Sequence, residues 1–144
     1  MKTVKTIIAV IACLMAFMLK GHAATEKLPI NSLPVNAMSF VQQNFPNRQI
    51  ASIEKEMMGD SFEVSLNDGT LIDFDNNGNW DAIDCHSDAV PANVVPAAIM
   101  QIINDNFPGT LVVEIDKEDY GYEVELPCGV FLHFNHNNQL LGFD

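Results

Sequence analysis

An internal repeat restricts the fold of this 144-residue chain more than any other feature of its sequence. Asn44-Phe45-Pro46 returns as Asn106-Phe107-Pro108, and Ile53-Glu54-Lys55-Glu56 returns as Ile115-Asp116-Lys117-Glu118, each 62 positions later. The second copy has two residues fewer in the stretch that corresponds to 58–61, so the match then continues at an offset of 60 positions. One register held over about 50 residues predicts two copies of a single structural unit. Further matches are Leu33-Pro34 with Val95-Pro96, 62–66 with 122–126, Gly69 with Gly129, Phe74 with Phe134, and Ile83-Asp84 with Phe143-Asp144.

Each copy is expected to hold one helix followed by four short strands. After Pro34 and after Pro96, apolar residues recur at helical spacing until a second proline ends the helix. Turns rich in Asn, Asp and Gly then separate alternating segments, which is typical of β-hairpins. The expected apolar helix positions are Val35, Met38, Phe40, Val41 and Phe45, then Ile99, Ile102, Ile103 and Phe107. The expected strands cover 49–58, 61–67, 70–75 and 79–84, then 111–119, 121–127, 129–135 and 139–143.

These elements predict an α+β fold, a tandem repeat of a helix plus a four-stranded antiparallel sheet. An alternative arrangement joins the two sheets into one eight-stranded sheet with both helices on one face. The predicted divisions are a signal peptide at 1–23, a loose N-terminal lead at 24–32, repeat 1 at 33–84, a linker at 85–94 and repeat 2 at 95–144.

The first 23 residues have the pattern of an export signal. Lysines precede an apolar run at 7–19, and Gly21-His22-Ala23 offers small residues for cleavage. A membrane anchor is one alternative, but the run is short for a bilayer. Val10-Ile11-Ala12-Cys13 resembles a lipoprotein cleavage box and leaves lipidation as another. The pattern predicts a periplasmic or secreted protein.

Removal of this signal leaves a strongly acidic chain. All 19 acidic residues lie beyond it with only four basic ones, Lys27, Arg48, Lys55 and Lys117, which gives a net charge of −15. Such a surface repels phosphate backbones and anionic headgroups, so nucleic-acid binding and stable membrane attachment are disfavoured. It favours cations or a basic protein as partners, although high net charge alone also keeps a protein soluble.

Alternation along the strands assigns two faces to the predicted sheet. The apolar face is expected to pack against the helices, and it holds Ile53, Phe62, Val64, Leu66, Ile72, Phe74, Leu111, Val113, Ile115, Tyr122, Val124, Leu126, Leu132 and Phe134. The opposite face collects nine carboxylates, although like charges on neighbouring strands cost stability. We therefore predict that it binds a protein, with two apolar anchors in an acidic field. The predicted partner-binding residues are Glu54, Glu56, Glu63, Leu71, Asp73, Glu114, Asp116, Glu118, Glu123, Glu125, Phe131 and His133.

The signal, the duplicated unit, the Asn-Phe-Pro after each helix and Leu71-Ile72-Asp73-Phe74-Asp75 leading to Gly78-Asn79-Trp80 resemble the PepSY-like periplasmic proteins. The resemblance covers about residues 33–144. It implies a fold like that of the beta-lactamase inhibitor protein, in which two helix-plus-sheet repeats form a joint sheet whose open face grips a protein. A periplasmic or secreted protein-binding module, acting as an inhibitor of a hydrolase or peptidase, is what this resemblance implies.

One turn of the first copy has the spacing of a calcium loop. Oxygen-bearing side chains recur as in an EF-hand, where a hard cation takes several oxygens from one tight turn. The flanks read as strands rather than helices, so a plain hairpin is the alternative. The candidate calcium ligands are Asp73, Asp75, Asn77, Asn79 through its backbone carbonyl, Asp81 and Asp84. The alternative function is therefore a calcium-binding or calcium-regulated cell-envelope protein.

The spacing of the cysteine and histidine residues does not match that of a known type of active site. An oxidising compartment would permit a disulfide between Cys85 and Cys128. His133 and His136 stand three residues apart, but the spacing of a closed zinc site is missing. Neither cysteine has the context of a nucleophile, and the carboxylates are too evenly spread to single out an acid and a base. We predict that the protein is not an enzyme and has no cofactor other than calcium.

Overall fold

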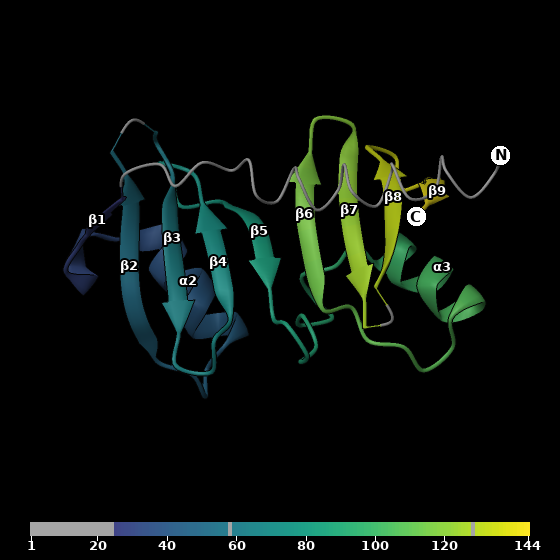
Figure 1. Cartoon of the computed structure of the whole chain (residues 1–144), viewed down its shortest axis with the longest axis horizontal. Coiled ribbons are helices and arrows are strands. Elements are labelled where there is room, and N and C mark those ends of the chain that lie inside the picture. The colour runs from purple at the N-terminus through teal and green to yellow at the C-terminus, as the bar shows by residue number, and fades with distance from the viewer. Residues whose placement is uncertain (1–24, 58, 128) are drawn as a thin grey trace, which may run out of the picture.

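The computed structural model describes residues 25–57, 59–127 and 129–144. It contains one nine-stranded antiparallel sheet whose strands follow one another in chain order, from β1 to β9 (Figure 1). Both α-helices lie behind this sheet in Figure 1, one across each half, and no described element covers the front. The strands are β1 (Thr25–Lys27), β2 (Ile50–Glu56), β3 (Phe62–Leu66), β4 (Leu71–Phe74), β5 (Trp80–Asp84), β6 (Glu114–Glu118), β7 (Gly121–Leu126), β8 (Val130–Asn135) and β9 (Leu140–Phe143). The helices are the 3-10 helix η1 (Ile30–Ser32), α2 (Val35–Asn44) and α3 (Ala97–Asn106).

The α+β class is confirmed, but the sheet has nine strands instead of eight. The additional strand is β1, which lies in the segment 24–32 that was expected to be loose. It pairs antiparallel with β2, so that Thr25 lies opposite Glu56 and Lys27 opposite Glu54. Without β1, the outer edge of β2 would present unpaired backbone N–H and C=O groups. Three residues are too few to show alternation, which is why the sequence pattern gave no sign of this strand.

Each α-helix begins directly after a proline and ends at a phenylalanine that a second proline follows. Pro34 and Pro96 fit these positions because the first N–H groups of a helix have no partner within it. Val35, counted among the apolar positions of α2, has a side chain that is 81% exposed, while Ala37 is fully buried. Two positions along a helix correspond to a rotation of about 200°, so these two side chains point to nearly opposite sides.

The core lies between the helices and the inner face of the sheet. Apart from Leu111, the strand residues predicted for this face are buried, Tyr122 only partly. Phe40 of α2 contacts the buried ring of Phe74 edge-on, with 5.8 Å between ring centroids. One prediction is wrong: Leu111 is 46% exposed, while Val112 and Val113 are both buried. The strand alternation was extended too far, because β6 begins only at Glu114.

The two halves of the sheet are joined by direct pairing of β5 with β6. Ile83 and Ile115 lie opposite each other at this seam, and both are fully buried. The pairs beside them, Ala82 with Asp116 and Asp84 with Glu114, face the open side. The seam therefore makes the apolar core and the open face continuous across the molecule.

Candidate functional site

The open face carries two rows of side chains that run across the strands. Residues directly opposite on neighbouring strands have Cβ atoms about 5 Å apart, so members of a row interact with their neighbours. The first row contains Glu54, Glu63, Asp73, Ala82, Asp116, Glu123 and His133. The second row contains Ser52, Ser65, Leu71, Asp84, Glu114, Glu125 and Phe131.

All twelve residues predicted for partner binding lie on this face: ten in the two rows, with Glu56 and Glu118 beyond them opposite Thr25 and Gly121. The sequence analysis missed two more carboxylates here. Asp84, assigned only to the calcium turn, lies between Leu71 and Glu114. Asp144 extends the second row, because its backbone exchanges two hydrogen bonds with that of Phe131, at 3.0 and 3.2 Å. Strand alternation would have placed both carboxylates on the open face. Ile83 and Phe143 are on the inner side of the sheet, so the residue that follows each of them faces outward.

One carboxylate in the middle of the face, Glu114, is difficult to ionise. Burial raises the pKa of Glu114 to about 8, and a hydrogen bond to Glu125 and the charges of Asp116 and Asp84 act in the same direction. Glu114 therefore keeps its proton at neutral pH and donates it to the Glu125 carboxylate.

Of the four lysine and arginine side chains that the structure describes, three lie away from the two rows. Arg48, Lys55 and Lys117 each lie over an aromatic ring, where ring and charge attract one another. Lys117 also donates a hydrogen bond to the backbone carbonyl of Trp80. Within the described chain, Lys27 at the β1 edge is the single basic residue that shares the open face, opposite Glu54. The distances from cation to ring centroid are 5.6 Å for Arg48 and Phe45, 5.1 Å for Lys55 and Phe62, and 4.0 Å for Lys117 and Trp80.

His133, at the β8 end of the first row, is the centre of a polar cluster. Its Nδ1 lies 3.0 Å from the Tyr120 hydroxyl and 3.2 Å from Oε2 of Glu123, and its Nε2 lies 3.3 Å from Oδ2 of Asp144. Burial and the neighbouring Glu123 raise the pKa of Tyr120 to about 12. The phenol stays protonated at physiological pH, so it serves as a hydrogen-bond donor and not as a nucleophile.

An open groove of about 450 Å³ borders this cluster. Its lining combines the polar side chains of Tyr120, His133 and Asp144 with 141–143 of β9. The sequence analysis did not foresee it, because it brings together the β6–β7 turn, β8 and β9, with an irregular register between His133 and Phe134. Hydrophobic and charged groups thus meet at the outer edge of the sheet.

The turn with calcium-loop spacing is the hairpin between β4 and β5. Oδ1 of Asp75 accepts the backbone N–H groups of Asn77 and Asn79, both at 2.8 Å. The hairpin between β8 and β9 repeats this arrangement, with Oδ1 of Asn135 accepting two backbone N–H groups at 2.9 and 3.0 Å. Since a neutral amide performs the task of the Asp75 carboxylate, the turn forms without help from a cation.

The remaining calcium candidates point in different directions. Asp73 lies on the open face opposite Ala82, and Asp81, one position before Ala82, faces the other side of β5. Oδ2 of Asp84 lies 3.1 Å from Nδ1 of His86. Within the described ranges, no three His, Cys, Asp or Glu side chains are grouped so as to hold a metal ion. The calcium site therefore stays a prediction.

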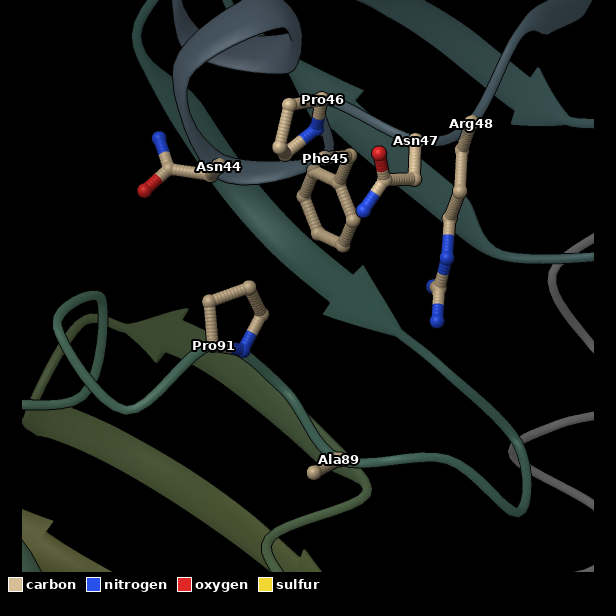
Figure 2. Close-up of a pocket in the computed structure, with 7 residues that line it drawn as sticks. All are labelled: Asn44, Phe45, Pro46, Asn47, Arg48, Ala89 and Pro91. Carbon is tan, nitrogen blue, oxygen red and sulfur yellow. The ribbon is translucent and has the colours of Figure 1, made fainter.

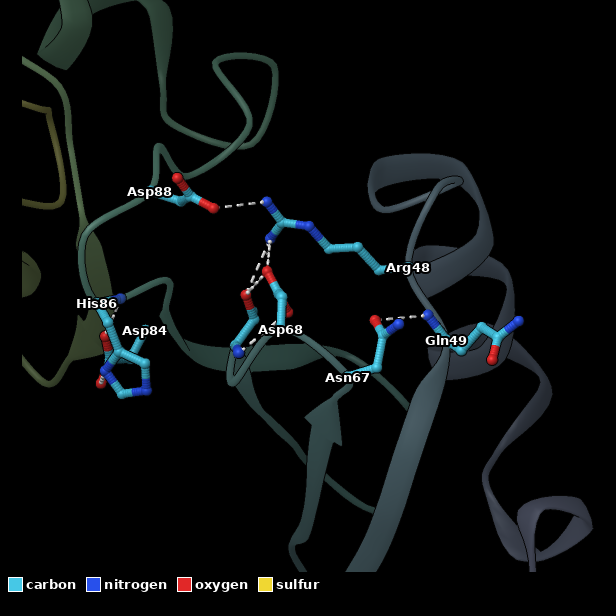
Figure 3. A network of polar contacts seen from close by, with 8 residues as sticks. Arg48, Gln49, Asn67, Asp68, Asp84, His86 and Asp88 are labelled. Atoms are coloured by element: carbon cyan, nitrogen blue, oxygen red, sulfur yellow. Dashed lines mark hydrogen bonds and ion pairs between the residues drawn. The ribbon is translucent and has the colours of Figure 1, made fainter.

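A small pocket of about 190 Å³ lies where the two halves meet (Figure 2). It is lined by Asn44, Phe45, Pro46, Asn47, Arg48, Ala89 and Pro91. None of these described residues is a carboxylate, histidine or cysteine, so the pocket offers no acid–base or nucleophilic chemistry. Arg48 links the halves from its rim, 2.7 Å from Asp68 and 3.2 Å from Asp88 (Figure 3). The pocket is best understood as part of a structural joint.

Two further predictions concern residues outside the described ranges. Cys85 is buried, and burial raises the pKa of its thiol. Cys128 is not described, so the disulfide stays a prediction. The signal peptide at 1–23 also lies outside the described residues. Neither α-helix that the structure describes is long and apolar enough to cross a membrane.

Comparison with known families gives the affiliation of the chain. The family described as "Putative beta-lactamase-inhibitor-like, PepSY-like" matches residues 18–61 and 60–142. The chain belongs to the PepSY-like family. This confirms the resemblance found in the motifs. Comparison with curated proteins gives no match.

Three solved structures are similar to this PepSY-like chain, each with a TM-score of 0.79. A "putative calcium-regulated periplasmic protein" from Bacteroides thetaiotaomicron is 29% identical, over 83% of this chain and 96% of its own. A "putative periplasmic protein of unknown function" from Bacteroides vulgatus is 28% identical, over 84% and 99%. A second periplasmic protein from Bacteroides vulgatus is 28% identical, over 86% and 99%. None of these descriptions names an enzymatic activity.

Proposed function

We propose that this protein is a periplasmic protein-binding module that holds a basic protein surface on its open face and thereby restrains a hydrolase or peptidase. The carrying observation is the gathering of carboxylates on that face, where burial, a hydrogen bond to Glu125 and neighbouring charges together raise the pKa of Glu114 to about 8. A cationic partner would neutralise this charge and gain attraction from both rows. The inhibitor-like family description and the periplasmic neighbours support the proposal.

Two apolar side chains supply anchors within the acidic field. Leu71 lies between Ser65 and Asp84, and Phe131 follows Glu125 in the same row. Both are half-buried, so each retains surface to bury against a partner. Aromatic and aliphatic anchors surrounded by polar groups are typical of binding hot spots.

The dimensions of the face suit an inhibitor. Nine strands at about 4.8 Å spacing give a width of ~38 Å. A standard protein–protein interface buries about 800 Å² on each partner, which a sheet of this width can supply. A broad, rigid surface of this kind covers the mouth of an active site without entering it, so inhibition by obstruction requires no chemistry from the module itself.

The proposal is tested by capture from the native cell-envelope fraction, followed by assay of captured hydrolases. Glu63→Gln with Glu123→Gln removes two charges from the open face. Asp60→Asn with Asp105→Asn removes two charges elsewhere and serves as the matched control, because both residues are exposed and stand outside the two rows. We expect the face variant to lose the captured partner and its inhibition, and the control to keep both.

A second face variant removes the anchors. Leu71→Asp combined with Phe131→Asp adds charge but eliminates the apolar contacts, so a partner held by this face should be lost. If every captured partner remains unchanged in this variant, the open face is not the binding site. If partners are lost but no captured hydrolase is slowed by the module, binding stands and the inhibitory role is refuted.

Calcium regulation is the second candidate, and a similar structure described as calcium-regulated favours it. We propose that the β4–β5 hairpin and its carboxylates would be the responsive segment. Asp75→Asn is the suited variant, because Asn135 supports the same turn with an amide. Millimolar calcium is expected to raise the melting temperature of the wild type but not of this variant. An unchanged wild-type melting temperature, with no heat of binding in calorimetry, would exclude the proposal.

A further inference from the structure

The two outer edges of the sheet differ in charge and in the apolar surface that they expose. β1 is three residues long and carries Glu26 and Lys27, and short, charged edge strands resist pairing with other chains. At the opposite edge, β9 reads Leu-Leu-Gly-Phe. Leu140, Leu141 and Phe143 are 41, 59 and 68% exposed. Long-lived exposure of such an edge is a liability unless a partner covers it.

The backbone of β9 is positioned to accept another strand. Asp144 turns its N–H and C=O toward Phe131 of β8. Because successive residues of an antiparallel strand direct these groups to alternate sides, Phe143 directs its own N–H and C=O outward. Within the described residues, no strand lies beyond β9. Pairing through these groups is how β-augmentation holds an extended peptide.

The chain itself shows what covers the equivalent edge in its first half. Ile83-Asp84 of β5 matches Phe143-Asp144 in the repeat, and the edge of β5 is paired antiparallel with β6. Ile115 of β6 lies beside Ile83, which is thereby fully buried. Phe143, without such a neighbour, is 68% exposed. A neighbour of β9 built on the same pattern would be an extended segment with an apolar residue opposite Phe143.

The same comparison specifies the residues on the other side of that segment. In β6, Glu114 lies opposite Asp84, and this acidic contact contributes to a pKa of about 8 for Glu114. Next to β9 the corresponding carboxylate is Asp144, which lines the groove. A basic side chain at that position would be attracted by the charge of Asp144, whereas Glu114 of β6 is repelled by the charge of Asp84.

A second copy of this chain does not fit these requirements. The strand that corresponds to β6 in the repeat is β2, and the outer edge of β2 is already paired with β1. Pairing of β9 with β9 of another copy would join two open faces of the same sign, each from a chain with a charge of −15 beyond the signal. The observations therefore favour a different polypeptide.

We propose that β9 is a docking edge that takes an extended segment of another protein, paired antiparallel, with apolar residues toward Phe143 and Leu140 and basic residues toward the groove at Asp144. This site extends the open face of the proposed function but uses backbone pairing, which the two rows do not. An extended basic tail or loop of a protein held on the open face is in reach of this edge.

The proposal is tested with labelled synthetic peptides and fluorescence anisotropy. The probe is acetyl-Lys-Val-Lys-Val-Lys-Val-amide. The first control replaces each Lys with Glu, and the second methylates the backbone nitrogen of alternate residues, which blocks strand pairing but keeps the charge. We expect each control peptide to bind at least about tenfold more weakly than the probe, a difference of about 1.4 kcal/mol.

Three variants of the protein complete the test. Phe143→Thr removes the apolar contact but keeps a strand-forming residue. Val35→Thr is its control, an equally solvent-facing apolar residue on α2 with 81% exposure. Gly142→Val fills the groove, and the fold tolerates it because a Cβ there would meet nothing within 4 Å. Phe143→Thr and Gly142→Val should each weaken binding about tenfold or more, and Val35→Thr should not.

Several results would overturn the proposal. Equal binding of the N-methylated peptide would mean attraction by charge without strand pairing. Equal binding by Phe143→Thr, or no binding by the wild type, would remove β9 as the site. Sedimentation that shows a dimer lost in Phe143→Thr would make a second copy the occupant. In each case, partner capture that depends on Glu63 and Glu123 would leave the proposed open-face function standing.

Discussion

Glu114 offers the sharpest test of the electrostatics that carry the proposed function. In the unfolded chain it titrates near 4.5, while in the folded protein burial raises its pKa to about 8. Below pH 4.5 both states hold the proton and the group has no effect on stability. Between pH 4.5 and 8 the folded state binds more protons than the unfolded state, so the free energy of unfolding falls as the pH rises.

The size of this effect follows from the shift. A difference of about 3.5 pH units corresponds to ~4.8 kcal/mol at most, at 1.36 kcal/mol per unit. Glu114 is only partly buried, and water screens its interactions, so we reduce the expectation to about 2 kcal/mol. Glu114→Gln keeps a neutral hydrogen-bond donor toward Glu125, and it should gain this amount over the wild type between pH 5 and pH 9.

Urea denaturation at pH 5, 7 and 9 measures the difference. Glu118→Gln is the matched control, because it removes a carboxylate from the exposed end of the same strand and face. The pH-dependent gain of Glu114→Gln should exceed that of the control by about 2 kcal/mol. Parallel stability curves for the two variants would show that the open face is not electrostatically strained, and the reasoning from charge crowding to a basic partner would fail.

Two other predictions concern the scaffold. Arg48→Ala removes contacts to Asp68 and Asp88 at the joint between the halves, and we expect a loss of about 1–2 kcal/mol in urea denaturation; no loss would make the joint dispensable. Gly78→Ala and Gly109→Ala both place a side chain at positive φ, +80° and +78°, which costs about 1 kcal/mol. Only at Gly78 would the new Cβ also lie 2.7 Å from a backbone nitrogen of α2, so thermal unfolding should show a clearly larger loss there, and equal losses would contradict this packing.

The sequence predicted the layers of the fold because alternation and helical spacing are local properties. Proline and Asn-Gly positions marked where helices and hairpins end, and the inward strand residues are buried as expected. β1 was missed because three residues cannot display a period, and their pairing with β2 is a tertiary event. Leu111 was misplaced because nothing in its own segment marks the late start of β6.

The candidate site was predictable as a face but not as a set of contacts. Alternation placed the carboxylates on one side, whereas the proton on Glu114 depends on the cross-strand register with Asp84 and Glu125. The groove beside β9 depends on Tyr120, a turn residue that no alternation orients. Spacing alone predicts a cation loop at Asp73 to Asp84, but it does not say which way each side chain points, because neighbouring strand residues face opposite sides.

The placement of the cations has a consequence for the kinetics of encounter. Arg48, Lys55 and Lys117 are engaged with aromatic rings, while eleven carboxylates gather on the open face of the sheet. The molecule therefore has an electrostatic axis roughly along the sheet normal. At physiological ionic strength a field of this kind acts over about 8 Å, enough to rotate an approaching cationic surface before contact. Association with such a surface should slow steeply as salt is added, while dissociation changes little.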